Sequence, residues 1–235
     1  SVEETLQESI QDFCARLRKS DLLMLAGGFS AQDEPEGSGK YMANFLRNPQ
    51  VKEAVEDLLR RDGLILGICN GFQGLIKSGL LPYGEILPPK DTMPVLTYNT
   101  SGKHMSRMVQ TKVVSRNTPW MSKASLGDVH HVPISHGEGR LVVSESLFQE
   151  LKEKGQVITQ YVNEKGQPTM EAPYNPNGSY YAIEGLASPC GKIFGKMGHS
   201  ERCAEGLYQN YAGQYYLDFF KAGLAYFKDQ NRRDS

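Results

Sequence analysis

One cysteine of the sequence stands where a nucleophile is expected. Residues 67–71 read Gly-Ile-Cys-Asn-Gly, so glycines lie two positions before and after Cys69. Such glycines let the backbone turn sharply between a strand and a helix without steric cost, and a helix N-terminus favours the reactive thiolate. We therefore predict a nucleophilic thiol that is presented at a turn and not buried. The other three cysteines have no comparable setting and are expected only to pack: Cys14, Cys190 and Cys203.

A cysteine nucleophile needs a base, and two histidines have a carboxylate two positions later. His199 is followed by Glu201, and His136 by Glu138. In an extended segment, residues i and i+2 point the same way, so each carboxylate can orient an imidazole whose other nitrogen faces the thiol. We rank His199 first because it follows the predicted strand 193–197, and sites of α/β folds gather at strand ends. Glycines on both sides of Glu138 favour backbone contact with a ligand.

Other chemistries fit these residues less well. The sequence has no Cys-x-x-Cys and no His-Glu-x-x-His, and Cys190, His199 and Cys203 match no common zinc spacing, so we expect no metal. The adjacent His130 and His131 are expected to be structural. The segment that begins at Gly27 is not a nucleotide loop, but its double glycine at a strand end can offer backbone N–H groups to an oxyanion.

The first part of the chain predicts helices that alternate with strands. Apolar residues recur every three or four positions in the helical segments and form unbroken runs in the strands. The connections are too long for hairpins, which is typical of a parallel α/β sheet. The predicted elements are a helix from Ser1 to Leu17 with a Ser-x-x-Glu start, a strand buried on both faces over 21–26, a loop over 27–39, a helix over 51–59 and a strand over 64–68.

The remaining elements are less regular but continue the same domain. No repeat, low-complexity tract or linker divides the sequence, so we predict one domain over residues 1–235. The predicted elements are a helix over 70–77 that ends at Gly79, strands and loops over 80–139, a helix over 144–154 capped by Ser144, a β-hairpin over 180–197, an amphipathic helix over 216–227 and a solvated tail over 228–235.

The composition excludes several classes of protein. Lys plus Arg number 26 and Asp plus Glu 27, so a net charge of −1 gives no electrostatic footprint for nucleic acid or an anionic membrane. No apolar stretch approaches the roughly 18 residues of a membrane span, and the first residues do not read as a secretory leader. Because the four cysteines show no short pairing, we expect a cytoplasmic protein.

Five short segments occur in the order seen in one enzyme family. They are residues 27–30 (Gly-Gly-Phe-Ser), 67–73 (Gly-Ile-Cys-Asn-Gly-Phe-Gln), 136–140 (His-Gly-Glu-Gly-Arg), 175–179 (Asn-Pro-Asn-Gly-Ser) and 198–202 (Gly-His-Ser-Glu-Arg). From about Ser20 to Phe227, the chain resembles the glutaminase domain of phosphoribosylformylglycinamidine synthases, which are triad-type (class I) glutamine amidotransferases. The resemblance implies a three-layer, flavodoxin-like α/β fold with a mostly parallel central sheet.

The resemblance also implies a reaction. Cys69 would attack the side-chain amide of glutamine, form a thioester and release ammonia, with His199 as acid and base and Glu201 orienting it. A synthetase portion, fused or separate, would use the ammonia with ATP and magnesium to convert formylglycinamide ribonucleotide to the amidine in purine biosynthesis, and this chain would need no cofactor. The other implied site residues are oxyanion donors at the backbone of Gly28 and Asn70 and substrate contacts from Gln73, His136, Gly137 and Glu138.

The chain departs from that family at two places. The family often has prolines around the histidine, whereas this chain has Gly198 and Ser200 and keeps only the His-x-Glu spacing. The family's domain also usually opens with a strand and a helix before the point where Ser1 lies. We therefore expect the first strand of the family's sheet to be missing here and the chain to be a C-terminal piece of a longer synthase.

Two other functions are consistent with the same residues. A regulatory module would hold glutamine to control a partner, with turnover incidental. Another cysteine hydrolase could use a similar scaffold, because a fold alone does not fix a substrate. Substitution of Cys69 and labelling with an electrophilic glutamine analogue distinguish these functions from a glutaminase.

Overall fold

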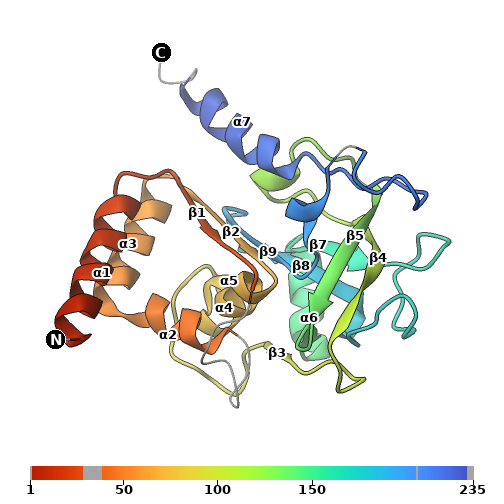
Figure 1. Cartoon of the computed structure of the whole chain (residues 1–235), viewed down its shortest axis with the longest axis horizontal. Helices are drawn as coiled ribbons and strands as arrows, with labels where there is room; N and C mark the ends of the chain where they lie inside the picture. The colour runs from red at the N-terminus through yellow and green to blue at the C-terminus, as the bar shows by residue number, and fades with distance from the viewer. Residues whose placement is uncertain (1, 29–38, 205, 232–235) are drawn as a thin grey trace.

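The structure is a computed structural model that describes residues 2–28, 39–204 and 206–231. A central β-sheet runs through the molecule, with helices around it (Figure 1). In the described residues the strands are β1 (Leu22–Leu25), β2 (Leu64–Ile68), β3 (Val95–Thr97), β4 (Met105–Val113), β5 (Val129–His136), β6 (Arg140–Val142), β7 (Val157–Tyr161), β8 (Ile183–Ala187) and β9 (Ile193–Lys196).

The helices gather at the ends and faces of this sheet. The helix α1 packs against α3, α2 packs against α4, and α7 packs against the short turn η1. No helix within the described ranges is long and apolar enough to cross a membrane. The helices are α1 (Val2–Leu17), α2 (Lys40–Arg47), α3 (Pro49–Arg60), α4 (Asn70–Ser78), α5 (Leu80–Tyr83), α6 (Glu145–Glu153) and α7 (Phe219–Asn231), with 3-10 turns η1 (Pro119–Met121), η2 (Tyr180–Ala182) and η3 (Ser200–Arg202).

The sheet is mixed. Its strand order is β1-β2-β9-β8-β7-β4-β5, and β3 pairs with β6 separately. The pairs β1–β2 and β2–β9 are parallel, whereas the remaining four pairs are antiparallel. The expected α/β class is confirmed, but the expectation of a mostly parallel sheet is wrong, because β4, β5, β7 and β8 make only antiparallel pairs and β9 is parallel only to β2.

The parallel pairing of β2 with β9 places two distant segments side by side. Ile68 is opposite Lys196 in the register, so both strands end at the same edge of the sheet. Cys69 directly follows β2, and His199 comes three residues after β9. Side chains that follow the carboxyl ends of parallel strands meet in the crevice at that edge.

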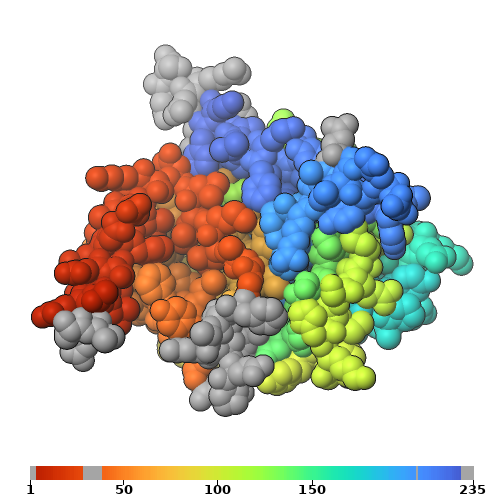
Figure 2. Space-filling view, in the orientation of Figure 1, coloured from red at the N-terminus to blue at the C-terminus, as the bar shows by residue number. Residues whose placement is uncertain are grey.

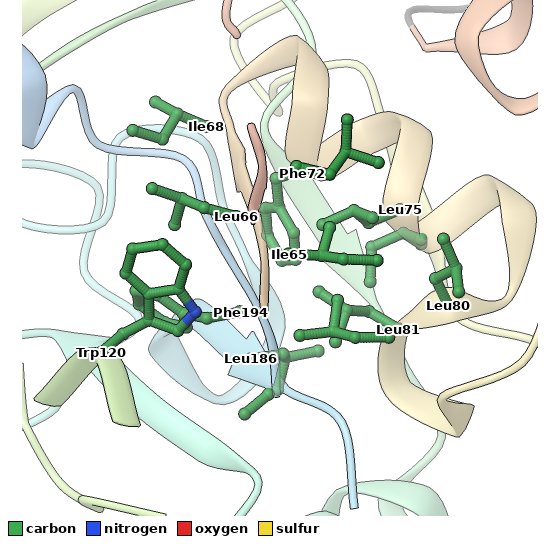
Figure 3. Close-up of a cluster of buried hydrophobic side chains, with 14 of the residues drawn as sticks. Ile65, Leu66, Ile68, Phe72, Leu75, Leu80, Leu81, Trp120, Leu186 and Phe194 are labelled. Atoms are coloured by element: carbon green, nitrogen blue, oxygen red, sulfur yellow. The ribbon is translucent and has the colours of Figure 1, made fainter. Parts of the chain in front are cut away.

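The core lies around the buried strands β2, β8 and β9. All five residues of β2 are buried, as are all of β8 and β9. In Figure 3, Leu66 lies on the side of β2 that carries Trp120 and Phe194, whereas Ile65 lies on the other side with Phe72 and Leu75. Strands buried on both faces need continuous apolar runs, which is what the sequence of β2 supplies.

The first helix covers α3 with a narrower apolar face than the sequence predicts. Ile10, Cys14 and Leu17 are buried, but Leu6 is 53% exposed. The predicted cap at Ser1 lies outside the described residues. In Figures 1 and 2, this helix forms the outer edge of the red and orange side of the molecule, away from the green-to-blue strands.

Several predicted elements are confirmed. The strand over 64–68, the helix that ends at Gly79 and the hairpin of β8 with β9 lie where the sequence places them. Ser144 caps α6 by accepting a hydrogen bond from the Leu147 N–H at 3.2 Å, and Gly79 follows α4 with a φ of 89°, in the left-handed region that glycine adopts easily.

Other elements differ from the predictions. The strand β1 is not buried on both faces, since Met24 is 38% exposed, because β1 stands at an edge of the sheet. The helix over 40–47 and the strand over 157–161 are both present, although the sequence patterns do not predict either. The helix α7 begins at Phe219 and continues into the predicted tail. The predicted loop over 27–39 falls mostly outside the described residues.

Candidate active site

A sharp backbone turn places Cys69 between β2 and α4. Cys69 has a φ of 53° and a ψ of −108°, a strained conformation for a residue with a side chain. Its N–H donates to Lys196 O at 2.9 Å, and its carbonyl accepts from the Gln73 N–H at 3.0 Å. The cysteine is therefore held by the neighbouring strand β9 and by the first turn of α4, as the nucleophile of a strand-to-helix elbow is.

The two glycines of the elbow are required by close packing. A Cβ on Gly71 would lie 2.0 Å from Leu25 O in β1, and a Cβ on Gly67 would lie 2.9 Å from Gly71 C. Since heavy atoms cannot approach this closely, any side chain at either position would push α4 away from the sheet. The glycines that the sequence singled out thus allow the helix to start against the strand ends.

The imidazole of His199 meets the thiol at the same edge. A Cβ placed on Gly27 would lie 2.8 Å from His199 Cε1 and 3.1 Å from Cys69 Cβ, so the two side chains come together over this glycine. His199 Nδ1 lies 2.6 Å from Glu201 Oε1, so the predicted contact forms. The expected extended segment is wrong, because His199 caps the 3-10 turn η3 (Ser200–Arg202). The other ring nitrogen, Nε2, faces Cys69 and has no other partner in the described part of the chain.

Opposing effects set the protonation of this pair. Burial would lower the pKa of His199, but contacts with Cys69 and Glu201 outweigh it and raise the pKa to about 9. Burial would raise the pKa of Glu201, but the hydrogen bond from His199 lowers it. The site therefore favours a protonated imidazole held by an ionised carboxylate, which suits proton donation to a leaving group.

A small pocket of about 60 Å³ contains most of the expected site residues. Cys69 is only 6% exposed, so the thiol lies at the bottom of this pocket, and the expectation of a thiol presented and not buried is wrong. The Ser135 carbonyl oxygen lies 3.8 Å from Cys69 Sγ, and the next three residues, 136–138, also line the pocket. The pocket is lined by Gly28, Cys69, Gln73, Ser135, His136, Gly137, Glu138, His199 and Arg202.

The wall opposite the elbow is the turn 136–139, which the rest of the fold holds in place. Gln73 donates from Nε2 to the Glu138 carbonyl. Asn99 donates from Nδ2 to His136 O at 2.9 Å and accepts from the Gly139 N–H at 3.0 Å, and its own N–H donates to Gly137 O at 2.9 Å. The buried Asn99 thus clamps this turn at three points.

His136 is in the pocket but is not poised as a base. Burial, followed by repulsion from His199 and His104, lowers its pKa to about 4. Neither of its ring nitrogens has a hydrogen-bond partner among the described residues. The geometry therefore favours His199 over His136 as the base, in the order that the sequence predicts, and the contact of His136 with substrate stays a prediction.

The expected oxyanion donors lie at two ends of secondary structure. Gly28 follows β1, lines the pocket and has a φ of 136°, which glycine tolerates. Asn70 is the first residue of α4, where backbone amides are not used by the helix's own hydrogen bonds. Both backbone positions lie next to the thiol, where an oxyanion would form. Their role as oxyanion donors stays a prediction.

Five residues that line the pocket or hold its segments in place are not predicted from the sequence. Ser135 and Arg202 line the pocket; Ser135 directly precedes the 136–140 segment, and Arg202 is the last residue of the 198–202 segment but was given no role. Asn99, Glu184 and Lys196 act from outside the motifs, and no sequence pattern points to them. In the described residues, no group of three or more His, Cys, Asp or Glu side chains is arranged to hold a metal ion.

Comparison with known proteins agrees with this geometry. The sequence model of the CobB/CobQ-like glutamine amidotransferase domain matches residues 1–230. The PurQ subunit of phosphoribosylformylglycinamidine synthase from Methanococcus maripaludis is 38% identical over 202 residues, covering 82% of this chain and 70% of that protein. The PurQ subunit from Aquifex aeolicus is 34% identical over 197 residues, covering 84% and 79%.

A solved structure gives the same answer for the fold. A chain of PurLQS from Thermotoga maritima superposes with a TM-score of 0.65 at 29% identity, covering 88% of this chain and 80% of that chain. The resemblance drawn from the five segments is therefore confirmed. The chain belongs to the CobB/CobQ-like glutamine amidotransferase domain family and, within it, to the relatives of the PurQ subunit of phosphoribosylformylglycinamidine synthase.

Proposed function

We propose that the chain is the glutaminase of a phosphoribosylformylglycinamidine synthase. It hydrolyses the side-chain amide of glutamine and supplies the ammonia to a synthetase that converts formylglycinamide ribonucleotide to formylglycinamidine ribonucleotide in purine biosynthesis. The observation that carries this function is the meeting of Cys69 and His199 over Gly27 at the shared end of β2 and β9. The substrate is inferred from the family, and the type of reaction is inferred from the geometry of the site.

The first half of the reaction forms a thioester. With His199 already protonated, Cys69 Sγ attacks the amide carbon of glutamine as the anion, and the carbonyl electrons move to the oxygen. Backbone N–H groups at Gly28 and Asn70 stabilise this oxyanion. When the intermediate collapses, the carbon–nitrogen bond breaks and His199 gives its proton to the departing nitrogen. Ammonia leaves, and the glutamyl group stays on Cys69.

The second half uses water. His199 removes a proton from a water molecule, whose oxygen attacks the thioester, and the carbon–sulfur bond breaks. Cys69 Sγ departs with the bonding electrons and the proton taken from water stays on His199, which restores the starting state, so the sum is glutamine plus water to glutamate plus ammonia. Glu201 keeps Nδ1 of His199 as the donor throughout, which leaves Nε2 for every proton transfer.

The rest of the pocket orients the substrate. Gln73 and the 136–138 wall contact the amino-acid end of glutamine, and the neutral His136 can give or take a hydrogen bond without bringing a second charge near the imidazolium. The exposed guanidinium of Arg202 lies at the same pocket and suits the substrate carboxylate.

The partner is a synthetase. The solved relative is titled as PurLQS, and we propose that this chain likewise works with a synthetase portion, fused or separate. ATP and magnesium act in that partner, and this chain holds no cofactor of its own in the reaction. The predicted cytoplasmic location stays a prediction.

Substitution of the thiol tests the proposed function. In the complex with its synthetase, Cys69→Ala is expected to abolish amidine synthesis from glutamine and to leave synthesis from added ammonia intact, because only the thioester step is lost. The matched control is Cys190→Ala, which removes an exposed free cysteine. Glutamine-dependent synthesis that survives in Cys69→Ala would support a regulatory glutamine-binding module instead.

A second experiment separates a glutaminase from another cysteine hydrolase. A diazo-ketone analogue of glutamine, followed by peptide mapping, is expected to label the peptide that contains Cys69 and no other cysteine peptide, with glutamine protecting it. Labelling at a different position, or labelling that glutamine does not prevent, contradicts the proposal.

A further inference from the structure

A buried ion pair lies next to the segment that carries the catalytic histidine. Glu184 belongs to β8 and Lys196 to β9, and these neighbouring strands are paired with Gly185 opposite Lys196. The two side chains are 0% and 1% exposed, and Lys196 Nζ lies 3.6 Å from Glu184 Oε1. Lysine and glutamate are almost never buried this completely unless they are paired.

Glu184 holds the backbone just before the histidine. Its Oε1 accepts a hydrogen bond from the Gly198 N–H at 2.7 Å, and its carbonyl accepts from the Met197 N–H at 3.1 Å. The Thr159 hydroxyl donates to the other carboxylate oxygen and fixes its plane. A Cβ on Gly198 would lie 2.8 Å from Glu184 Oε1, and a proline there would have no N–H to donate, so this contact requires glycine.

Lys196 holds the other side of the same segment. Its Nζ donates to Ser200 Oγ at 2.7 Å, directly after His199. Its carbonyl accepts from the Cys69 N–H at 2.9 Å, so one residue contacts both the backbone of the nucleophile and the segment of the base. The ion pair thus forms hydrogen bonds with the residues on both sides of His199, Gly198 and Ser200. The Lys196 carbonyl also connects this segment to the elbow at Cys69.

We propose that the Glu184–Lys196 pair positions His199 for proton transfer with Cys69. The proposal rests on the proposed function, in which His199 is the acid and base. Neither charged side chain lines the pocket, so both are positioning residues that act through the backbone and Ser200.

Stability alone is a weak reason for such a pair. Apolar residues of similar volume often stabilise a fold as well as a buried ion pair does, because the charges lose their hydration. What apolar residues cannot do is hold an N–H and a hydroxyl on either side of one histidine. The pair is therefore expected to matter more for catalytic geometry than for folding.

A double substitution separates these two contributions. Glu184→Gln together with Lys196→Met removes both charges without leaving either one unpaired, so the melting temperature is expected to stay close to wild type. The kcat of glutamine hydrolysis is expected to fall about tenfold or more, as for a misplaced catalytic group, with KM for glutamine within about twofold. The matched control is Lys192→Met, whose lysine pairs with Asp62 at the far end of β9 and is expected to keep wild-type kcat.

A second pair of variants decides the matter if the double variant does not fold. Ser200→Ala removes the acceptor of Lys196 and is expected to lower kcat without raising KM, whereas Ser200→Thr keeps a hydroxyl and is expected to recover part of the loss. A double variant with wild-type kcat, or a Ser200→Ala variant with unchanged kcat, overturns the proposal. So does a loss of activity that appears only as a higher KM.

A spectroscopic measurement keeps this proposal separate from the proposed function. In an NMR titration, the His199 imidazole of the wild type is expected to titrate near pH 9 and that of the double variant at lower pH, because its contacts loosen. This readout needs no turnover. A wild-type chain that shows no glutaminase activity in the complex with its synthetase refutes the proposed function alone, whereas an unchanged His199 titration in the double variant refutes the positioning role.

Discussion

Two histidines share one pocket but are driven to opposite protonation states. His199 gains Glu201 and Cys69 as partners, which raise its pKa to about 9 against the effect of burial. His136 gains no hydrogen-bond partner in the described residues, and burial with the nearby charge of His199 lowers its pKa to about 4. Two groups whose surroundings separate their pKa values in this way have different roles. We therefore expect the protonated histidine to transfer its proton and the neutral one to contact the substrate.

The raised pKa of His199 predicts how stability depends on pH. A pKa of about 9 in the folded state, against 6.5 for an ordinary histidine, stabilises the fold fully below about pH 6.5, and this contribution disappears as pH rises through 9. At about 1.36 kcal/mol per unit, the wild type should lose about 3 kcal/mol of unfolding free energy across this window. Urea unfolding at a series of pH values measures it.

The variant His199→Gln should lack most of this decline between pH 6.5 and 9. The control His104→Gln removes an exposed histidine and should keep the wild-type slope. Parallel pH profiles for wild type and His199→Gln would show that the imidazole gains no such stabilisation on folding.

At the scale of elements, the site depends on how closely α4 approaches the edge strand β1. At Gly71 the nearest atom to an added Cβ is the carbonyl oxygen of Leu25, which belongs to the backbone and cannot move independently. At Gly74, one turn later on the same helix, the nearest atom is the sulfur of Met42, at the end of a flexible side chain. Two glycines of one helix therefore tolerate a methyl group very differently.

Substitution of these two glycines by alanine tests that difference. Gly71→Ala should destabilise the protein by about 1–3 kcal/mol, because the backbones of α4 and β1 must separate. Gly74→Ala should cost less, since Met42 can move and alanine favours the helix by about 0.5–1 kcal/mol. Thermal unfolding compares them, at about 2–4 °C per kcal/mol for a chain of this size. Equal melting temperatures would contradict the close contact.

The turn 136–139 makes a second prediction at this scale. Asn99→Ala removes the side-chain clamp on His136 and Gly139, so KM for glutamine should rise about tenfold while kcat changes less, as expected when binding contacts loosen. Asn163→Ala is the matched control, since Asn163 holds an exposed turn away from the pocket through Lys165 and Gln167. A fall in kcat with unchanged KM would place Asn99 in the chemistry itself.

What the sequence predicts at this scale is mainly local. The elbow was predictable, because an apolar run, two glycines and a helical spacing are adjacent in sequence and each has a local physical cause. The parallel pairing of β2 with β9 could not be predicted from residue patterns, since register between segments more than a hundred residues apart depends on the whole packing. Glu184 and Lys196 were missed because charged residues are expected at the surface.

At the scale of the whole molecule, the two catalytic groups come from opposite halves of the chain. The elbow belongs to the part that is red to yellow in Figure 1, and the imidazole follows the blue strand β9. The 136–139 wall starts at the last residue of β5 and leads to β6, in the middle of the chain. The pocket exists only when all three segments are folded together, so binding of glutamine and stability of the fold are linked.

The small, covered pocket predicts that turnover depends on the synthetase. Ammonia released into water is protonated and lost as a nucleophile, so a glutaminase that runs uncoupled wastes its substrate. Cys69 is 6% exposed in a pocket of about 60 Å³, so access to its thiol is restricted.

The isolated chain should therefore be a poor glutaminase, and the synthetase with ATP and formylglycinamide ribonucleotide should raise kcat about tenfold or more, because partner binding favours the competent conformation. Glutamate release measured with and without the partner tests this, and Cys69→Ala sets the background. If kcat is the same in both conditions, the pocket is already competent alone, and the ammonia must be retained by some means other than coupled activation.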